Sequence, residues 1–166
     1  TSALANAKLK GFKLPARITT VGFEEGEKRL GDFTVSFIRV THSIPDTSHI
    51  FIKTPIANFY HGSDFKFDES PSDGRKSDYE KIKRVGLEGI TCLMSDCLGV
   101  EKKGRAGSEL QLSDNFFEEI KNCRGKFIVT TYSSHVARLN QIIEVSKRVG
   151  RKICFVGRSL SKVTEV

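Results

Sequence analysis

Two residues of the chain have the side chains and the positions of metal ligands. His42 follows the apolar run "FTVSFIRV" and begins "HSIPD", where Pro45 and Asp46 favour a rigid turn. Asp64 follows a second apolar run, "ANFY", through "HGS". One hairpin can close the 22 residues between them, and imidazole and carboxylate both suit zinc or manganese. The pair is only half of a metal site, and spacing alone favours a turn histidine and a capping aspartate.

Other polar residues in this region have structural explanations. His49 and His61 lie within or at the end of predicted strands, where a histidine with a backbone partner is more usual than a metal ligand. Asp68, Asp73 and Arg75 belong to a loop and are typical turn residues. We therefore interpret these five residues as structural.

Two stretches are candidates for binding phosphate. "TTYSSHVAR" places Ser133, Ser134 and His135 at a helix start, where unpaired N–H groups and the helix dipole attract anions. "VGRSLSK" repeats the arrangement with Arg158 and Ser159. Both follow predicted parallel strands, which open on one edge of a sheet, where α/β folds bind ligands. For the first stretch, the residues alone favour a serine that only caps the helix.

Charge is distributed unevenly along the chain, whose net charge is +7. Residues 1–120 hold 17 Lys and Arg against 18 Asp and Glu, whereas residues 121–166 hold 10 against 2. A basic excess of this kind attracts polyanions such as nucleic acid, although a solvated basic helix face explains it as well. If the basic segment binds RNA, the binding should weaken as salt is raised.

The cysteines are expected to be buried reduced thiols. Cys92, Cys97, Cys123 and Cys154 form no C-x-x-C pair, and two of them lie in apolar runs. Reduced thiols favour the cytosol, so we expect a cytoplasmic protein. No apolar run approaches the length of a membrane span, and no targeting segment is recognisable. Because the first residue is Thr1, we expect the chain to be cut from something longer.

The elements that must position these residues change in type along the chain. Short apolar runs predict a β meander over residues 17–61, beginning with "RITTV". A loop then leads into a helix with Ser77 as its cap and Gly86 as its stop. From there strands and helices alternate, which predicts βαβ units on a parallel sheet. The expected segments are a buried strand "GITCLMS", a helix "LSDNFFEEIKNC", a strand "KFIVTTY", a helix at about 134–149 and a strand "KICFVG".

The sequence thus predicts an α/β fold whose first part has α+β character. In the helix at 134–149, Val136, Leu139, Ile142, Ile143 and Val145 should pack inward, and Arg138, Lys147 and Arg148 should point outward. The unusually long loop at 95–109 is the candidate boundary between two structural units.

Five motifs in one order resemble a known family. They are "VTHSIPD", "HGSDFKFDESPSDGR", "LMSDCLGVEKKGRAGSE", "FIVTTYSSHVARLNQIIEVSKRVGRK" and "VGRSL". Together they resemble bacterial ribonuclease J, an RNA-processing member of the metallo-β-lactamase superfamily with an inserted β-CASP domain. The resemblance implies that residues 1–104 are a portion of the metallo-β-lactamase domain with its αββα fold, and that residues 105–166 begin the β-CASP domain.

The resemblance also implies roles for individual residues. His42 matches a metal-binding histidine of the family, and Asp64 matches the aspartate that bridges two metals. Asp96 matches a β-CASP signature acidic residue at the domain junction. "TYSSHVAR" is similar to a segment of the β-CASP domain that helps to form the RNA channel, so Ser134 and His135 are expected to contact RNA.

The chain departs from the family pattern in several places. Gly62 and Ser63 replace a Thr-Gly pair before the bridging aspartate, which keeps small residues at the turn. Leu98 and Gly99 replace a Thr-Asn pair after Asp96, so any role of those side chains is lost. The family's main metal motif, H-x-H-x-D-H, and its later histidines are not in this chain, so we expect the chain alone to be inactive.

The function implied by the resemblance is metal-dependent hydrolysis of RNA, both inside the chain and from the 5′ end. The expected cofactor is a pair of zinc ions, with manganese or magnesium as alternatives, and the partner is RNA rather than a membrane. The full-length protein is expected to be a homo-oligomer, a dimer or tetramer. Two other hypotheses remain open: a β-CASP nuclease acting on DNA or other RNA, and a non-catalytic RNA-binding or scaffold protein with a degenerate fold.

Overall fold

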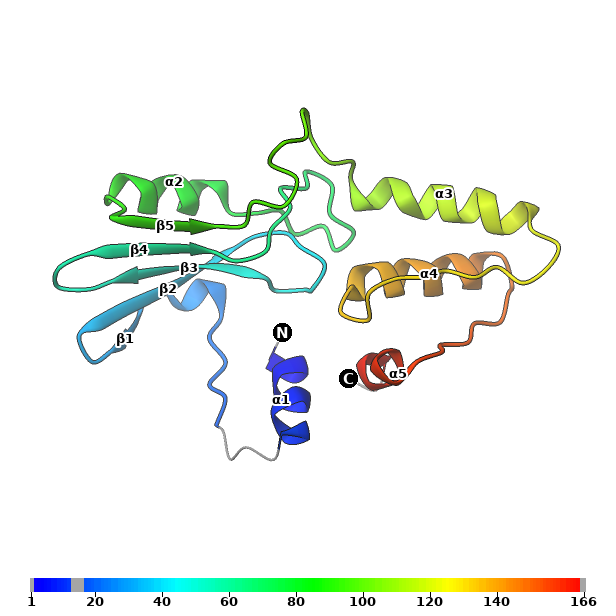
Figure 1. Cartoon of the computed structure of the whole chain (residues 1–166), viewed down its shortest axis with the longest axis horizontal. Helices are drawn as coiled ribbons and strands as arrows, with labels where there is room; N and C mark the ends of the chain where they lie inside the picture. Colours follow the sequence, from blue (N-terminus) through cyan, green and yellow to red (C-terminus); the bar gives the residue numbers. More distant parts are fainter. Residues whose placement is uncertain (1, 13–16, 165–166) are drawn as a thin grey trace.

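The computed structural model describes residues 2–12 and 17–164. It has a β-rich part, covered on one side by a helix, and a helical part at the C-terminal end (Figure 1). The strands are β1 (Lys28–Leu30), β2 (Phe33–Arg39), β3 (Ser48–Lys53), β4 (Asn58–Gly62) and β5 (Cys92–Ser95). The helices are α1 (Ser2–Gly11), α2 (Tyr79–Leu87), α3 (Glu109–Asn122), α4 (Val136–Arg148) and α5 (Arg158–Thr164), with a 3₁₀ turn, η1, at Phe23–Glu25.

The five strands form one mixed sheet in chain order, β1 to β5. Strands β1 to β4 are an antiparallel meander, and β5 adds to β4 in the parallel direction. The parallel step requires a crossover, which α2 provides between β4 and β5. The predicted mixed α/β class is confirmed, with the parallel pair placed at the edge that carries Asp64 and Asp96.

The predicted meander starts later than the sequence indicated. Residues 17–22, which include "RITTV", form no strand, and the first strand is Lys28–Leu30 instead. Leu30 pairs with Phe33 across a two-residue turn in which Gly31 has φ 63°, a conformation that favours glycine. A tight hairpin partner therefore decides which segment becomes the first strand, and β propensity alone does not.

The core lies between α2 and the centre of the sheet. Ile38 of β2, Phe51 of β3, Tyr60 of β4 and Val85 of α2 are buried together. Burying an aliphatic or aromatic side chain of this size contributes about 1.5–3 kcal/mol, so this cluster is the main anchor of α2. The loops that leave β2 and β4 consequently start from fixed strand ends.

The N-cap of α2 lies one residue later than the sequence predicted. Asp78, not Ser77, is the N-cap, because its side chain accepts a hydrogen bond from the Lys81 N–H. Ser77 is buried, and its hydroxyl accepts from the Thr41 N–H at 3.0 Å. The helix also runs past Gly86 to Leu87. Ser77 thus fixes the residue beside His42 instead of capping α2.

In the helical part, α3 and α4 pack side by side (Figure 1). Leu139, Ile142 and Val145 of α4 are buried as predicted, and Ile120 of α3 is buried with them. Arg138 is not directed outward as expected, since its guanidinium pairs with Glu109 at 2.7 Å. The apolar period of α4 therefore identified its packed face correctly but misassigned one charged residue.

Two predicted strands of the second part are wrong. Residues 126–132 and 152–157 form no strand, because neither has a hydrogen-bonded strand neighbour among the residues that the structure describes. Extended apolar segments become strands only where another backbone pairs with them. The parallel sheet expected in this part is consequently not formed within the described residues.

The expected burial of β5 and of the thiols is also wrong. All four residues of β5 are exposed, because β4 is its single strand neighbour in the described part of the chain. Cys92, Cys97 and Cys154 are exposed, Cys123 is half-buried, and all four thiols are free. Two of these cysteines lie in β5 and in the unpaired segment 152–157, which explains their exposure. No helix among the described residues has the length and apolar character of a membrane span.

Candidate functional site

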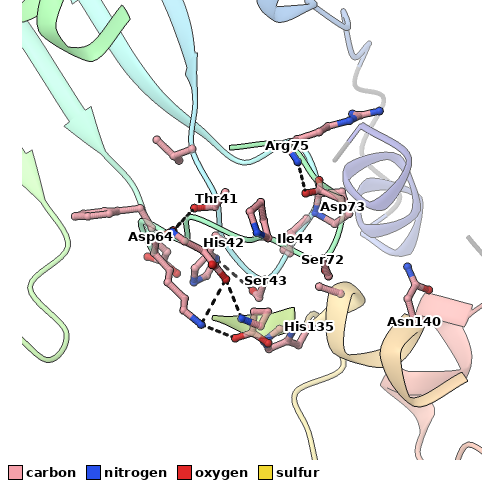
Figure 2. A pocket seen from close by; sticks show the side chains of 18 of the residues that line it. Thr41, His42, Ser43, Ile44, Asp64, Ser72, Asp73, Arg75, His135 and Asn140 are labelled. Carbon is pink, nitrogen blue, oxygen red and sulfur yellow. Dashed lines mark hydrogen bonds and ion pairs between the residues drawn. The ribbon is translucent and has the colours of Figure 1, made fainter. Parts of the chain in front are cut away.

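A pocket of about 870 Å³ lies between the loops that follow β2 and β4 and the starts of α3 and α4 (Figure 2). Its lining includes five of the eight predicted site residues: His42, Asp64, Asp96, Ser134 and His135. Three of these come from loops of the β-rich part and two from the helical part. The fold therefore brings together residues that are as much as 93 positions apart in the sequence, from His42 to His135.

His42 stands beside a buried anchor. Thr41 is buried, its N–H donates to Ser77, and its hydroxyl donates to the Lys66 carbonyl. The next residue, His42, is exposed, and its ring Nδ1 lies 3.2 Å from the Ser43 hydroxyl. The backbone at this strand end is thus held firmly while the imidazole faces the pocket (Figure 2).

Asp64 is positioned by the end of β4. Ser63 donates its hydroxyl hydrogen bond to the Ser48 carbonyl at 2.7 Å. Beyond Asp64, the Lys66 N–H donates to the Thr41 carbonyl at 2.8 Å. Because this backbone hydrogen bond joins Thr41 and Lys66, the loops that carry His42 and Asp64 run next to each other. The hairpin closure expected from the sequence is therefore present at the backbone level.

Gly62 allows β5 to approach this strand end closely. A Cβ atom at Gly62 would lie 3.3 Å from the Met94 carbonyl oxygen, which is tighter than ordinary contact. Gly62 pairs with Ser95, and Asp96 follows directly. Asp64 and Asp96 thus follow the carboxyl ends of two neighbouring parallel strands. Ligands usually bind at these ends in such sheets.

Asp96 is partly engaged in its own loop. Its carboxylate accepts a hydrogen bond from the Leu98 N–H at 2.9 Å, and the residue is half-buried in the pocket wall. The replacement of the family's threonine by Leu98 does not affect this bond, since the donor is a backbone N–H. The side chain of Leu98 is exposed and also lines the pocket.

The donor set fits a metal only in part. Imidazole from His42 and carboxylate from Asp64 are suitable zinc ligands by type. Within residues 2–12 and 17–164, however, no three histidine, cysteine, aspartate or glutamate residues are grouped closely enough to hold an ion. His42 and Asp64 can therefore supply two ligands of a metal site, and further ligands are needed to complete it.

Neither Ser133 nor Ser134 is the N-cap of α4. The N-cap is His135, whose ring Nδ1 accepts the Arg138 N–H at 3.2 Å. Ser134 is exposed on the pocket wall, while Ser133 does not line the pocket. Burial lowers the pKa of His135, and the neighbouring Arg138 charge lowers it further. A neutral ring is what the cap requires, because only an unprotonated nitrogen can accept the hydrogen bond.

Arg158 and Ser159 do not share this pocket. They lie in the first turn of the seven-residue α5, where both are exposed, and neither lines the pocket. The expected common sheet edge is missing because the two strands that should precede these junctions are not formed in the described residues. The structure therefore separates them from His42 and Asp64.

Three of the residues predicted to be structural, Asp68, Asp73 and His61, accept hydrogen bonds from backbone N–H groups. Asp68 is buried, and its carboxylate accepts from the N–H groups of Ser70 and Glu109, both at 2.9 Å. Asp73 accepts from the Arg75 N–H at 3.0 Å, which is a turn contact. The ring of His61 accepts the Ser63 N–H at 3.3 Å, next to Asp64.

Sequence reasoning missed Glu109, which joins both halves of the pocket. Its carboxylate lies 2.7 Å from the Lys66 ammonium and 2.7 Å from the Arg138 guanidinium. Burial acts to raise the pKa of Glu109, but the hydrogen bonds from Lys66 and Arg138 outweigh it and leave the pKa below its usual value. The one sequence signal was a serine followed by an acidic residue at a helix start, which is too common to single it out.

Comparisons with known proteins relate this chain to one family. Residues 124–166 match a family model described as the β-CASP domain of ribonuclease J. A ribonuclease J of Thermus thermophilus is 37% identical over 134 residues, which are 81% of this chain and 23% of that protein. One from Pyrococcus abyssi is 32% identical over 173 residues, covering 100% of this chain and 38% of that protein. One from Synechocystis is 39% identical over 136 residues, covering 81% and 21%.

A solved structure supports the fold alone. It is a crystal structure of a protein of unknown function from Enterococcus faecalis, with a TM-score of 0.54 and 17% identity, covering 79% of this chain and 32% of that one. The chain spans between about a fifth and two fifths of the length of the curated relatives above. The resemblance inferred from the five motifs is confirmed: over most of its length the chain is similar to a portion of ribonuclease J, and its residues 124–166 to the β-CASP domain of that family.

Proposed function

We propose that this chain is part of a metal-dependent ribonuclease of the ribonuclease J type, and that the pocket is part of its RNA-cleaving site. The observation that carries the proposal is the convergence of His42, Asp64 and Asp96 on one pocket with the start of α4. The reaction class, cleavage of RNA, is taken from the relatives, which are named ribonuclease J.

In this proposal His42 and Asp64 hold metal together with ligands from outside the described residues. Bound zinc would supply a water of lowered pKa and would stabilise charge on the scissile phosphate. The chain's own contribution is to orient these two side chains, through the Thr41 to Lys66 backbone bond and the Ser63 hydroxyl. The donors at the start of α4, Ser134 and His135, would face the RNA backbone across the pocket.

Finer features of the proposal rest on the resemblance. They are cleavage both within RNA and from its 5′ end, two zinc ions with manganese or magnesium as alternatives, a cytoplasmic location and a homo-oligomeric full-length protein. Ser133, Arg158 and Ser159 stay proposed RNA contacts, although they lie outside the pocket. The boundary near residue 104 between the two domains is proposed on the same basis, as is the inactivity of the chain by itself.

The test uses the full protein that contains this chain. Its activity would be measured on 5′-monophosphorylated RNA and on DNA of the same sequence, before and after chelation, with zinc, manganese and magnesium added back separately. We expect RNA cleavage that chelation abolishes and an added metal restores. Cleavage of DNA at a rate equal to that of RNA would favour the β-CASP nuclease with another substrate.

The second candidate function is a non-catalytic RNA-binding or scaffold protein. The observation in its favour is that the described residues hold no group of three metal ligands. It predicts that the full protein binds RNA but cleaves neither substrate with any of the three metals. That outcome would overturn the nuclease proposal.

A further inference from the structure

Glu109 occupies the point where three separate segments meet. It is the first residue of α3, directly after the N-cap Ser108. The three segments are the loop after β4 with Lys66 and Asp68, the start of α3, and the first two turns of α4. Glu109 forms ion pairs with both the Asp64 loop, through Lys66, and α4, through Arg138.

The carboxylate of Glu109 binds one cation from each side. Oε1 accepts from Lys66 Nζ at 2.7 Å, and Oε2 accepts from Arg138 Nη2 at 2.7 Å. The ring Nε2 of His135 is 3.9 Å from the same Oε2 atom. Lys66 is two residues beyond Asp64, and His135 is the N-cap of α4. One carboxylate thus links the loop of a proposed metal ligand to the helix start that faces it.

The backbone of Glu109 reinforces the same link. Its N–H donates to Asp68 Oδ2 at 2.9 Å, and its carbonyl accepts from Gln141 Nε2 at 2.6 Å. Asp68 and Gln141 are both buried. The Glu109 side chain is 16% exposed, and its two partners are 25% and 21% exposed, so water and salt screen the ion pairs only weakly.

We propose that Glu109 is a positioning residue that sets the distance and orientation of α4 relative to the Asp64 loop, a role that rests on the proposed nuclease function. Its carboxylate also neutralises Lys66, which lines the pocket. Two consequences follow from its removal. The two sides of the pocket lose their fixed relation, which slows catalysis, and the Lys66 charge becomes available to RNA phosphates, which strengthens binding.

The experiment compares Glu109→Gln with wild type in the full protein. The amide keeps the size of the side chain and all backbone bonds. It removes the charge and leaves one acceptor oxygen in place of two, so it can accept from only one of Lys66 and Arg138. We expect kcat on RNA to fall about tenfold or more, because small displacements of reacting groups have effects of this size. We expect the Kd for RNA, measured without cleavage in the presence of chelator, to fall about threefold, with a steeper salt dependence.

The matched control is Glu119→Gln, which makes the same change of charge on the same helix. Glu119 is exposed and does not line the pocket. Its substitution should leave both kcat and Kd within about twofold of wild type. An effect equal to that of Glu109→Gln would mean that the net charge of α3 is responsible, and would overturn the positioning role.

Other outcomes are equally decisive. If kcat of Glu109→Gln stays within twofold of wild type, Glu109 has no positioning role. If kcat falls and Kd is unchanged, the claim that Glu109 neutralises Lys66 toward RNA is wrong. If circular dichroism shows that the variant does not fold, Arg138→Gln takes its place. This change removes the ion pair between Glu109 and α4 and leaves the ion pair between Glu109 and Lys66. That variant should also lower kcat, and an unchanged kcat would refute the link. A wild-type protein that cleaves no RNA would refute the proposed function instead.

Discussion

At the scale of single residues, His49 and Tyr60 form a polar pair inside the apolar core. The His49 Nδ1 atom lies 2.7 Å from the Tyr60 hydroxyl, and both residues are buried. Phe65 packs edge-on against the imidazole, with ring centroids 5.0 Å apart. Burial lowers the pKa of His49 to about 4, helped by the nearby His61, and burial raises the pKa of Tyr60 to about 12. Both side chains are therefore neutral in the folded protein at neutral pH.

The buried histidine predicts an acid-sensitive stability. Its pKa is about 4 when folded and near 6.5 when unfolded, so between these pH values the unfolded chain binds a proton that the folded chain does not. The free energy of unfolding should therefore fall as pH is lowered from about 6.5 to about 4, by at most about 3 kcal/mol from this group. Urea unfolding of wild type and of His49→Gln across this range tests the expectation. A loss of stability as steep in the variant as in wild type would assign it to other groups.

At the scale of elements, the start of α4 combines two roles in one residue. His135 caps the helix through Nδ1, and its ring lies in the wall of the pocket. A serine at this position would also cap the helix, because its hydroxyl can accept the same N–H. The two roles can therefore be separated by substitution.

We predict that His135→Ser and His135→Ala differ in stability but not in RNA binding. The serine variant keeps the cap, whereas alanine loses it at a cost of about 1 kcal/mol. If the imidazole contacts RNA, both variants should bind RNA more weakly than wild type, by about threefold or more. Thermal unfolding and RNA titration of the two proteins check this. Normal RNA affinity in the serine variant would show that His135 only caps α4.

Elements were predictable from the sequence where local signals decide them. The apolar period of α4 and the apolar run "FTVSFIRV" both correspond to elements in the structure, although Ser36 and Ile38 form the buried side of β2. The segments at 126–132 and 152–157 have similar β propensity but no strand. Strand formation depends on a pairing partner, which is a non-local property that a single stretch of sequence does not contain.

At the scale of the whole molecule, the pocket depends on contacts between distant segments. The motif order pointed to His42, Asp64 and Asp96, and the structure gathers them in one pocket. Glu109 was missed because its partners lie 43 and 29 residues away in the sequence, and no periodicity connects them. Arg158 and Ser159 were placed with the site by an expected sheet edge that the described residues do not form. Local motifs therefore indicated the candidate site, and only the fold showed how its two sides are joined.

The most direct test of the account is the effect of Asp64→Asn on RNA cleavage by the full protein. The change keeps the shape of the side chain and removes the charge that would hold metal. Asp73→Asn is the control, because Asp73 is an exposed aspartate of the same pocket wall and makes the same change of charge. We predict that Asp64→Asn lowers the cleavage rate about 100-fold or more at saturating metal, and that Asp73→Asn stays within about threefold of wild type. Equal activity of Asp64→Asn and wild type would contradict the assignment of this pocket as the RNA-cleaving site.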